Sequence, residues 1–151
     1  MKKVRSRTGA GANTAARAST QAMFSLLQAA QAIEKRLEEA LEQVGLSNAK
    51  FGALTHLVQA GEPLSLSECA ARMTCVRSNV TQLMDRLEAE GLVRRVDDPD
   101  DRRGVRAMVT SLGIERQAAG AKQVDQVQRE FARNLAGVDP STLSRALQAF
   151  K

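Results

Sequence analysis

The sequence has few of the residues on which catalysis and metal binding most often depend. It contains one histidine, His56, and two cysteines, Cys69 and Cys75, among 151 residues. A single imidazole gives little scope for general acid-base chemistry, and one His with two Cys lacks the spacing of a four-ligand zinc site. The sequence also has no Gly-rich phosphate-binding loop and no recognisable Ser-His-Asp nucleophile motif. We therefore predict that the chain is not an enzyme and holds no metal ion or cofactor.

Long apolar runs are also missing. No run approaches the roughly 18 residues that a membrane-spanning helix needs. The basic N-terminal stretch MKKVRSRTGAGANTAARAST contains no apolar region of the kind that follows the charges of a signal peptide. With 43% apolar and 26% charged residues, the composition is typical of a globular protein. We predict a cytoplasmic protein with no membrane partner.

The net charge of +5 is concentrated near the N-terminus. The first 20 residues include no acid and five cations, which are Lys2, Lys3, Arg5, Arg7 and Arg17, and the remaining chain holds 17 basic and 17 acidic residues. Since this segment has almost nothing to bury, we predict that residues 1–19 form a flexible basic arm. Basic arms bind DNA by releasing counterions, but a solubilising tail has the same composition, so both roles remain open.

Apolar periodicity gives the organisation of the rest of the chain. Apolar residues recur at three- and four-residue steps in several segments and alternate in two others. We predict helices over residues 20–45, 48–60, 65–73, 76–90, 111–137 and 140–150, and strands over residues 92–96 and 105–109. Thr110 is a suitable N-cap for the fifth helix, and Asp139 followed by Pro140 is suitable for the sixth. The fold class is mainly α with a small antiparallel β-hairpin.

Residues 68–113 contain the most informative order of elements. They read ECAARMTCVRSNVTQLMDRLEAEGLVRRVDDPDDRRGVRAMVTSLG, in which helix, turn, helix, strand, charged tip and strand follow without a gap. This order is typical of a winged helix-turn-helix, which binds double-stranded DNA. We place this unit at about residues 48–110, with the hairpin as its wing.

Short hydrogen-bonding side chains gather at the start of the second helix of this motif. They are Arg77, Ser78, Asn79, Thr81 and Gln82. In a major groove, Arg bonds guanine bidentately, Asn or Gln bonds adenine, and Ser or Thr reaches phosphates or bases. A solvated polar helix face has the same composition, and it would be the preferred interpretation without the neighbouring wing.

The predicted wing tip runs from Asp97 to Gly104 and crowds four acids around two arginines. Asp and Pro are turn formers, and an Asp such as Asp101 can fix a nearby guanidinium by a forked hydrogen bond. We predict that Arg102 and Arg103 enter the minor groove, where an arginine responds to groove width more than to base identity.

The terminal helices, at about residues 20–45 and 111–151, carry apolar stripes. A fifth helix of about 26 residues would be ~39 Å long, which exceeds what one small core covers. We therefore predict dimerisation helices in a two-fold homodimer, whose symmetry suits a pseudo-palindromic operator. A monomer that folds these helices onto its own core is the alternative.

The runs LSLSECAARMTCVRSNVTQLMDRLEAEGLVRR and DDPDDRRGVRAMVTSLG closely resemble the MarR-type transcriptional regulators. The shared features are the helix-turn-helix, the DRLE-GL helix end, the D-R-R wing and the V-T-x-x-G start of the fifth helix. The flanking helices match in number and order, so the resemblance covers about residues 20–151 as one domain. It implies a homodimeric repressor whose affinity for DNA falls when a small aromatic or phenolic ligand binds between the dimer helices and the DNA-binding lobe.

The resemblance also implies roles for individual residues. It places Arg77 to Gln82 on the recognition helix and Arg103 at the groove-inserting position of the wing, and it gives Asp85 and Arg86 a bracing role between helix and wing. The chain departs from the family at Thr74-Cys75-Val76, where Gly-Val-Ser is common. The usual Ser cap is missing there, so Thr74 or Ser78 must cap the recognition helix.

Two further functions remain as alternatives. Some members of the family sense oxidants through a thiol, so Cys69 or Cys75 could make the chain a redox-sensing regulator, although both positions suit core packing. A winged-helix module that binds proteins instead of DNA is the second. For a small ligand, the candidate contacts are His56, Phe51 and Met23. The alternative for the histidine is an ordinary surface or hydrogen-bonded residue that contacts no ligand.

Overall fold

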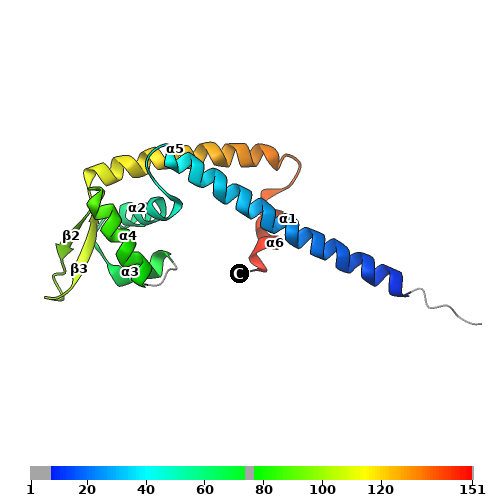
Figure 1. Cartoon of the computed structure of the whole chain (residues 1–151), viewed down its shortest axis with the longest axis horizontal. Helices are drawn as coiled ribbons and strands as arrows, with labels where there is room; N and C mark the ends of the chain where they lie inside the picture. Colours follow the sequence, from blue (N-terminus) through cyan, green and yellow to red (C-terminus); the bar gives the residue numbers. More distant parts are fainter. Residues whose placement is uncertain (1–7, 74–76, 151) are drawn as a thin grey trace, which may run out of the picture. The chain divides into compact units, whose positions relative to one another are not determined.

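The computed structural model describes residues 8–73 and 77–150. Its elements are α1 (Thr8–Glu42), α2 (Asn48–Ala60), β1 (Leu64–Ser65), α3 (Leu66–Met73), α4 (Arg77–Ala89), β2 (Val93–Asp97), β3 (Val105–Val109), α5 (Ser111–Asn134) and α6 (Pro140–Gln148) (Figure 1). The predicted fold class, mainly α with a small antiparallel sheet, is confirmed. The chain divides into two compact units, residues 1–36 and 37–151.

The first unit differs from the predicted flexible arm over residues 1–19, because α1 begins at Thr8. The segment is rich in alanine, the residue with the highest helix propensity. It extends an amphipathic helix that is already formed, so it does not require the unfavourable nucleation of a new helix. Residues 1–7, with four of the arm's five cations, lie outside the described part of the chain. The stretch from Gln21 to Ala32 is exposed throughout. Its large apolar side chains, Met23, Phe24, Leu26 and Leu27, are 39–54% exposed.

The core of the second unit lies among α2, α3, α4 and the sheet. Its largest fully buried side chains are Leu41, Leu54, Leu57, Leu64, Met84, Leu87 and Leu92. Burying each such side chain stabilises the fold by about 1.5–3 kcal/mol. Two residues fix the length of α2: Ser47 accepts a hydrogen bond from the Lys50 N–H, and Gly61 ends the helix at a φ of 67°. The predicted bounds of this helix, residues 48–60, are confirmed.

The sheet has the order β1-β3-β2, and every pairing is antiparallel. Leu64 pairs with Ala107 and Val93 with Val109. Leu64, Ala107 and Val93 are buried in the core, and Val109 is half-buried against it. The third strand was not predicted, since β1 has only two residues and shows no alternation. The pairing ties the segment before α3 to the middle of β3.

The joint between β3 and α5 is closely packed. Thr110 caps α5 as predicted, because its Oγ1 accepts a hydrogen bond from the Gly113 N–H at 3.0 Å. The same hydroxyl donates to the Gly91 carbonyl at 2.7 Å. A Cβ on Gly113 would lie 2.1 Å from the Leu92 carbonyl oxygen, so only glycine allows this approach. α5 ends at Asn134, three residues before the predicted end at Gly137.

The start of α6 also agrees with the prediction. Asp139 accepts a hydrogen bond from the Thr142 N–H at 2.8 Å, and Pro140 occupies the first helical position. The Ser141 hydroxyl, with the hydroxyl and N–H of Thr142, lowers the pKa of Asp139 to about 2. The helix ends at Gln148 and has no buried residue, although it is amphipathic.

Candidate nucleic-acid interface

The helix pair α3–α4 positions the candidate recognition surface. α3 begins with a capping box in which Glu68 Oε2 accepts from the Ser65 N–H at 2.7 Å and Ser65 Oγ accepts from the Glu68 N–H at 3.2 Å. These hydrogen bonds, the Ser65 N–H foremost, lower the pKa of Glu68. Cys69 on α3 and Val80 on α4 are buried in the shared core. One face of α4 is therefore fixed against the protein, and its opposite face is open.

The open face of α4 carries part of the predicted base-contacting set. Asn79 and Gln82 are exposed, and Thr81 is half-buried. Arg77 and Ser78 form the first turn of α4, but their side chains, like the proposed cap Thr74, lie outside the described structure.

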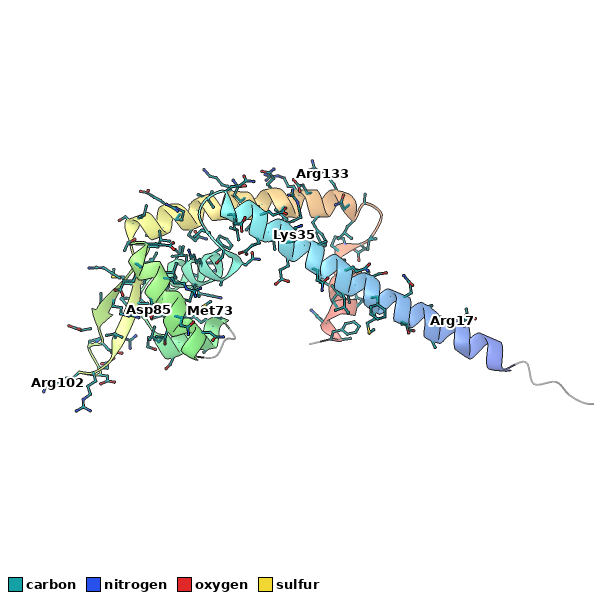
Figure 2. The ribbon with its side chains drawn as sticks, viewed as in Figure 1. Arg17, Lys35, Met73, Asp85, Arg102 and Arg133 are labelled. Carbon is teal, nitrogen blue, oxygen red and sulfur yellow. The ribbon has the colours of Figure 1, made fainter. Side chains whose placement is uncertain are left out.

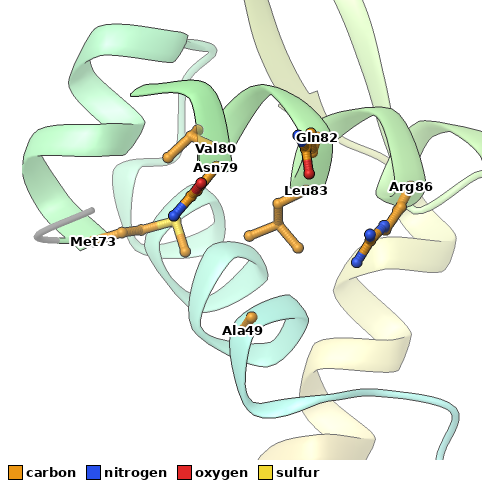
Figure 3. A pocket seen from close by; sticks show the side chains of 7 residues that line it. All are labelled: Ala49, Met73, Asn79, Val80, Gln82, Leu83 and Arg86. Atoms are coloured by element: carbon orange, nitrogen blue, oxygen red, sulfur yellow. The ribbon is translucent and has the colours of Figure 1, made fainter. Parts of the chain in front are cut away.

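A pocket of about 320 Å³ lies beside this face, lined by Ala49, Met73, Asn79, Val80, Gln82, Leu83 and Arg86. Figure 3 shows Leu83 pointing from α4 toward Ala49 of α2, with Arg86 farther along α4. The pocket therefore combines an apolar wall with the polar groups of the open face.

The wing, residues 93–109, projects its tip away from the core. Arg102 and Arg103 are exposed there, and Figure 2 shows Arg102 at the end of the hairpin. Asp101 Oδ1 accepts a hydrogen bond from the Arg103 N–H at 3.0 Å. Asp101 thus fixes the backbone of Arg103, whereas the sequence interpretation had an Asp holding the guanidinium of a groove-inserting arginine.

Two other tip acids, Asp98 and Asp100, face Arg106 of β3, a residue that the sequence interpretation did not select. Asp98 Oδ2 lies 3.0 Å from Arg106 Nε, and Glu68 Oε2 lies 3.4 Å from Arg106 Nη1. The pKa of Asp98 is lowered, first by the hydrogen bond from the Asp100 N–H and then by Arg106. The guanidinium pKa of Arg106 is raised, chiefly by Asp98. Asp98, Arg106 and Glu68 together form what we call the Arg106 cluster.

A second ion-pair group braces α4 against β2. Arg95 of β2 bonds the Asp85 carboxylate through Nη2 and Glu88 Oε2 through Nη1, the latter at 2.9 Å. These acids raise the pKa of Arg95, with Asp85 the larger cause. Asp85 therefore joins α4 to β2 of the wing through Arg95, and Arg95 also binds Glu88. Arg86 lines the pocket, and its bracing role stays a prediction.

The candidate ligand contacts belong to both units. Phe51 is half-buried, and its ring packs against Gly120 of α5, where an added Cβ would lie 2.7 Å from the ring. His56 is half-buried five residues farther along α2, on a different side of the helix. Met23 lies in the first unit and is 52% exposed. Within the described residues, no group of three or more His, Cys, Asp or Glu could hold a metal ion.

Cys69 is expected to be unreactive in the folded protein. It is 2% exposed, and burial raises the pKa of its thiol, which disfavours the nucleophilic thiolate. In a Cys75→Ser variant, an aromatic disulfide reagent should label no thiol in native buffer and label Cys69 once the protein is denatured. Rapid native labelling would contradict the buried position. Cys75 itself lies outside the described residues.

The described part of the chain contains no helix with the length and apolar character needed to cross a bilayer.

Comparison with known proteins gives one consistent family. The family model described as MarR family matches residues 46–105, from just before α2 to the start of β3. The HTH-type transcriptional repressor MdtR of Bacillus subtilis is 34% identical over 109 residues, which are 70% of this chain and 66% of MdtR. The chain spans about half the length of the first curated relatives that it matches, 54% of one and 56% of another.

Solved structures agree with this family. The transcriptional regulator BldR from Sulfolobus solfataricus has a TM-score of 0.69 at 27% identity, with 87% of this chain and 93% of BldR covered. A mutant MarR from E. coli complexed with operator DNA has a TM-score of 0.74 at 23% identity, with 83% and 89% covered, and shares the fold. These proteins are regulators and not enzymes.

Proposed function

Because the chain belongs to the MarR family of winged helix-turn-helix transcriptional regulators, we propose that it binds double-stranded DNA as a homodimer and represses transcription. The observation that carries the proposal is the open face of α4, with Asn79 and Gln82 exposed, in the same fold unit as a wing whose Arg102 and Arg103 are exposed. Amides of this kind suit adenine in a major groove, and arginines suit a narrow minor groove. Arg77 and Ser78 would extend the α4 surface toward its first turn.

The dimer is supported by apolar side chains that the single chain leaves exposed. In the first unit these lie on α1, at Met23, Phe24, Leu26 and Leu27. In the second unit they include Phe131 of α5, and α6 buries none of its residues. Apolar surface of this extent is typical of an interface. A two-fold dimer would bury it and would present two α4 helices to successive major grooves, about 34–36 Å apart.

Control by a small aromatic or phenolic effector is part of the proposal. The pocket beside α4 offers apolar walls from Met73 and Leu83 and a cation from Arg86. A ligand there would compete with DNA for Asn79 and Gln82, which line the same pocket. Such a ligand would lower DNA affinity only by its preference for the DNA-free state.

Two solution measurements test this function. Light scattering at micromolar concentration should give twice the chain mass, and labelled duplex DNA should bind with an affinity that falls steeply as salt rises. A single-stranded DNA of the same sequence is the matched control and should bind more weakly. A monomer would remove the proposed symmetry, and a failure to bind any duplex would leave the protein-binding winged module as the better account.

A further inference from the structure

We propose that Arg106 is a positioning residue for DNA recognition, which acts by fixing the wing tip to the start of α3. The inference rests on the proposed DNA-binding function and assigns it a residue that has no expected contact with DNA. Arg106 lies within β3 at the register position that pairs with Ser65 of β1 and with Val96 of β2. Its side chain is 24% exposed, whereas Arg102 and Arg103 are exposed at the tip.

The guanidinium joins two segments, residues 98–100 at the wing tip and residues 63–68 around β1 and the start of α3. Nε faces Asp98 Oδ2 at 3.0 Å, and the Asp98 side chain is 11% exposed. Nη1 lies 3.4 Å from Glu68 Oε2 and donates to the Pro63 carbonyl at 3.4 Å. Nη2 lies 4.0 Å from Asp100 Oδ2. One planar cation with several donors therefore connects the wing tip, the residue before β1 and the capping box of α3.

The tip itself is held from Asp98 onward by a series of hydrogen bonds. Asp98 Oδ1 accepts from the Asp100 N–H, and the Asp98 N–H donates to the Gly104 carbonyl, both at 3.0 Å. The Gly104 N–H donates to the Asp101 carbonyl at 2.8 Å, and the Asp101 carboxylate accepts from the Arg103 N–H. The backbone that carries Arg103 is thus fixed relative to Asp98, and Asp98 forms an ion pair with Arg106.

The far end of the Arg106 cluster reaches α3. Glu68 both closes the capping box with Ser65 and faces Arg106, so a shift of the wing would disturb the first turn of α3. A binding site requires its contacting groups to be held within about 0.5 Å of their working geometry by supporting residues. Arg106 supplies this support between wing and helix pair. Loss of Arg106 should therefore displace Arg103 without removing it.

A double-mutant cycle tests the inference. Arg106→Gln should weaken duplex binding about tenfold in the wild-type background, the size expected for loss of one specific arginine contact. In an Arg103→Ala background the same change should matter less than about twofold, because the group that it positions is gone. Arg94→Gln is the matched control: it removes one cation from the same hairpin, where Arg94 is exposed and donates to Met108 Sδ, and it should change affinity little.

The Asp98→Asn variant distinguishes an effect of positioning on DNA affinity from an effect of net charge. Removing an acid makes the wing more positive, so charge alone predicts tighter DNA binding, whereas positioning predicts weaker binding. Asp97→Asn, which removes an exposed neighbouring acid, should not weaken binding. The urea midpoint of each variant is measured alongside, and Asp98→Asn remains decisive if Arg106→Gln fails to fold.

The outcomes distinguish the inference from the function on which it rests. Three results would overturn the positioning role while DNA binding stands. Arg106→Gln could weaken DNA binding equally with and without Arg103, or Arg94→Gln could weaken it as much as Arg106→Gln does. The third is tighter DNA binding by Asp98→Asn. If Arg103→Ala binds as wild type does, the wing arginine is not a DNA contact and the inference falls. If the wild type binds no duplex, the proposed function fails first.

Discussion

Replacing Gly113 with alanine is expected to lower the free energy of unfolding by about 3 kcal/mol, the upper part of the usual range for overpacking. An added Cβ would lie 2.1 Å from the Leu92 carbonyl oxygen and 2.8 Å from Val109 Cγ2. The nearest atom belongs to the backbone, so relief requires α5 to move away from β2. That movement would also strain the Thr110 cap, which accepts from the Gly113 N–H.

Two other helical glycines give matched controls. Gly52 of α2 has no atom within 4 Å of an added Cβ, so Gly52→Ala should be neutral or stabilise by up to about 1 kcal/mol through helix propensity. At Gly120 the atom nearest to an added Cβ, at 2.7 Å, belongs to the Phe51 ring, a side chain that can turn. Gly120→Ala should therefore lower the free energy of unfolding by an intermediate amount. Urea unfolding at one fixed protein concentration measures all three. Equal stability of the Gly113 and Gly52 variants would contradict the described joint.

Replacing Gln82 with alanine is expected to cost about 1–3 kcal/mol of specific DNA affinity for each half-site, the usual value of one good base contact. Gln82 lies on the open face of α4, so its loss should leave stability within about 0.5 kcal/mol of wild type. In a homodimer the change occurs twice, and the total loss should be correspondingly larger. The measurement is a fluorescence titration with specific and unrelated duplexes at one salt concentration.

Gln59→Ala is the matched control for this change. Gln59 is also an exposed glutamine on a helix, but it lies near the end of α2. Its replacement should leave both specific and unrelated binding unchanged. If Gln82→Ala weakens the two duplexes equally, Gln82 supplies no base discrimination, and if it weakens neither, α4 does not carry the contact.

The sequence predicted those features that local chemistry determines. Thr110 and Asp139 cap their helices as expected, because N-cap preference depends on the neighbouring N–H groups alone. The start of α1 at Thr8 was not predicted, because residues 8–19 contain few large apolar side chains and the helix propensity of their alanines is a weaker signal than apolar periodicity. β1 was missed because two residues become a strand only through their pairing with β3.

The residues that support the candidate interface were harder to predict from the sequence. Arg103 was selected from a local motif, whereas Arg106 acquires its partners from segments 8 and 38 residues away. Likewise Arg95, the partner of Asp85, was not selected from the sequence, since the pairing depends on where β2 crosses α4. One signal was available: Ser65 and Glu68 have the spacing of a capping box. Ion pairs between distant elements leave no such local pattern.

Selection of bound duplexes from a random pool tests the central claim most directly, with the wild-type chain and an Asn79→Ala/Gln82→Ala variant run in parallel. The account predicts that the wild type enriches a pseudo-palindrome whose half-sites are centred about 10–10.5 base pairs apart, flanked by A·T-rich steps at the wings. The variant should retain weak binding but enrich this site poorly. Failure of the wild type to enrich any sequence, or enrichment of the same site by both proteins, would contradict the claim that α4 of a dimeric regulator selects the DNA.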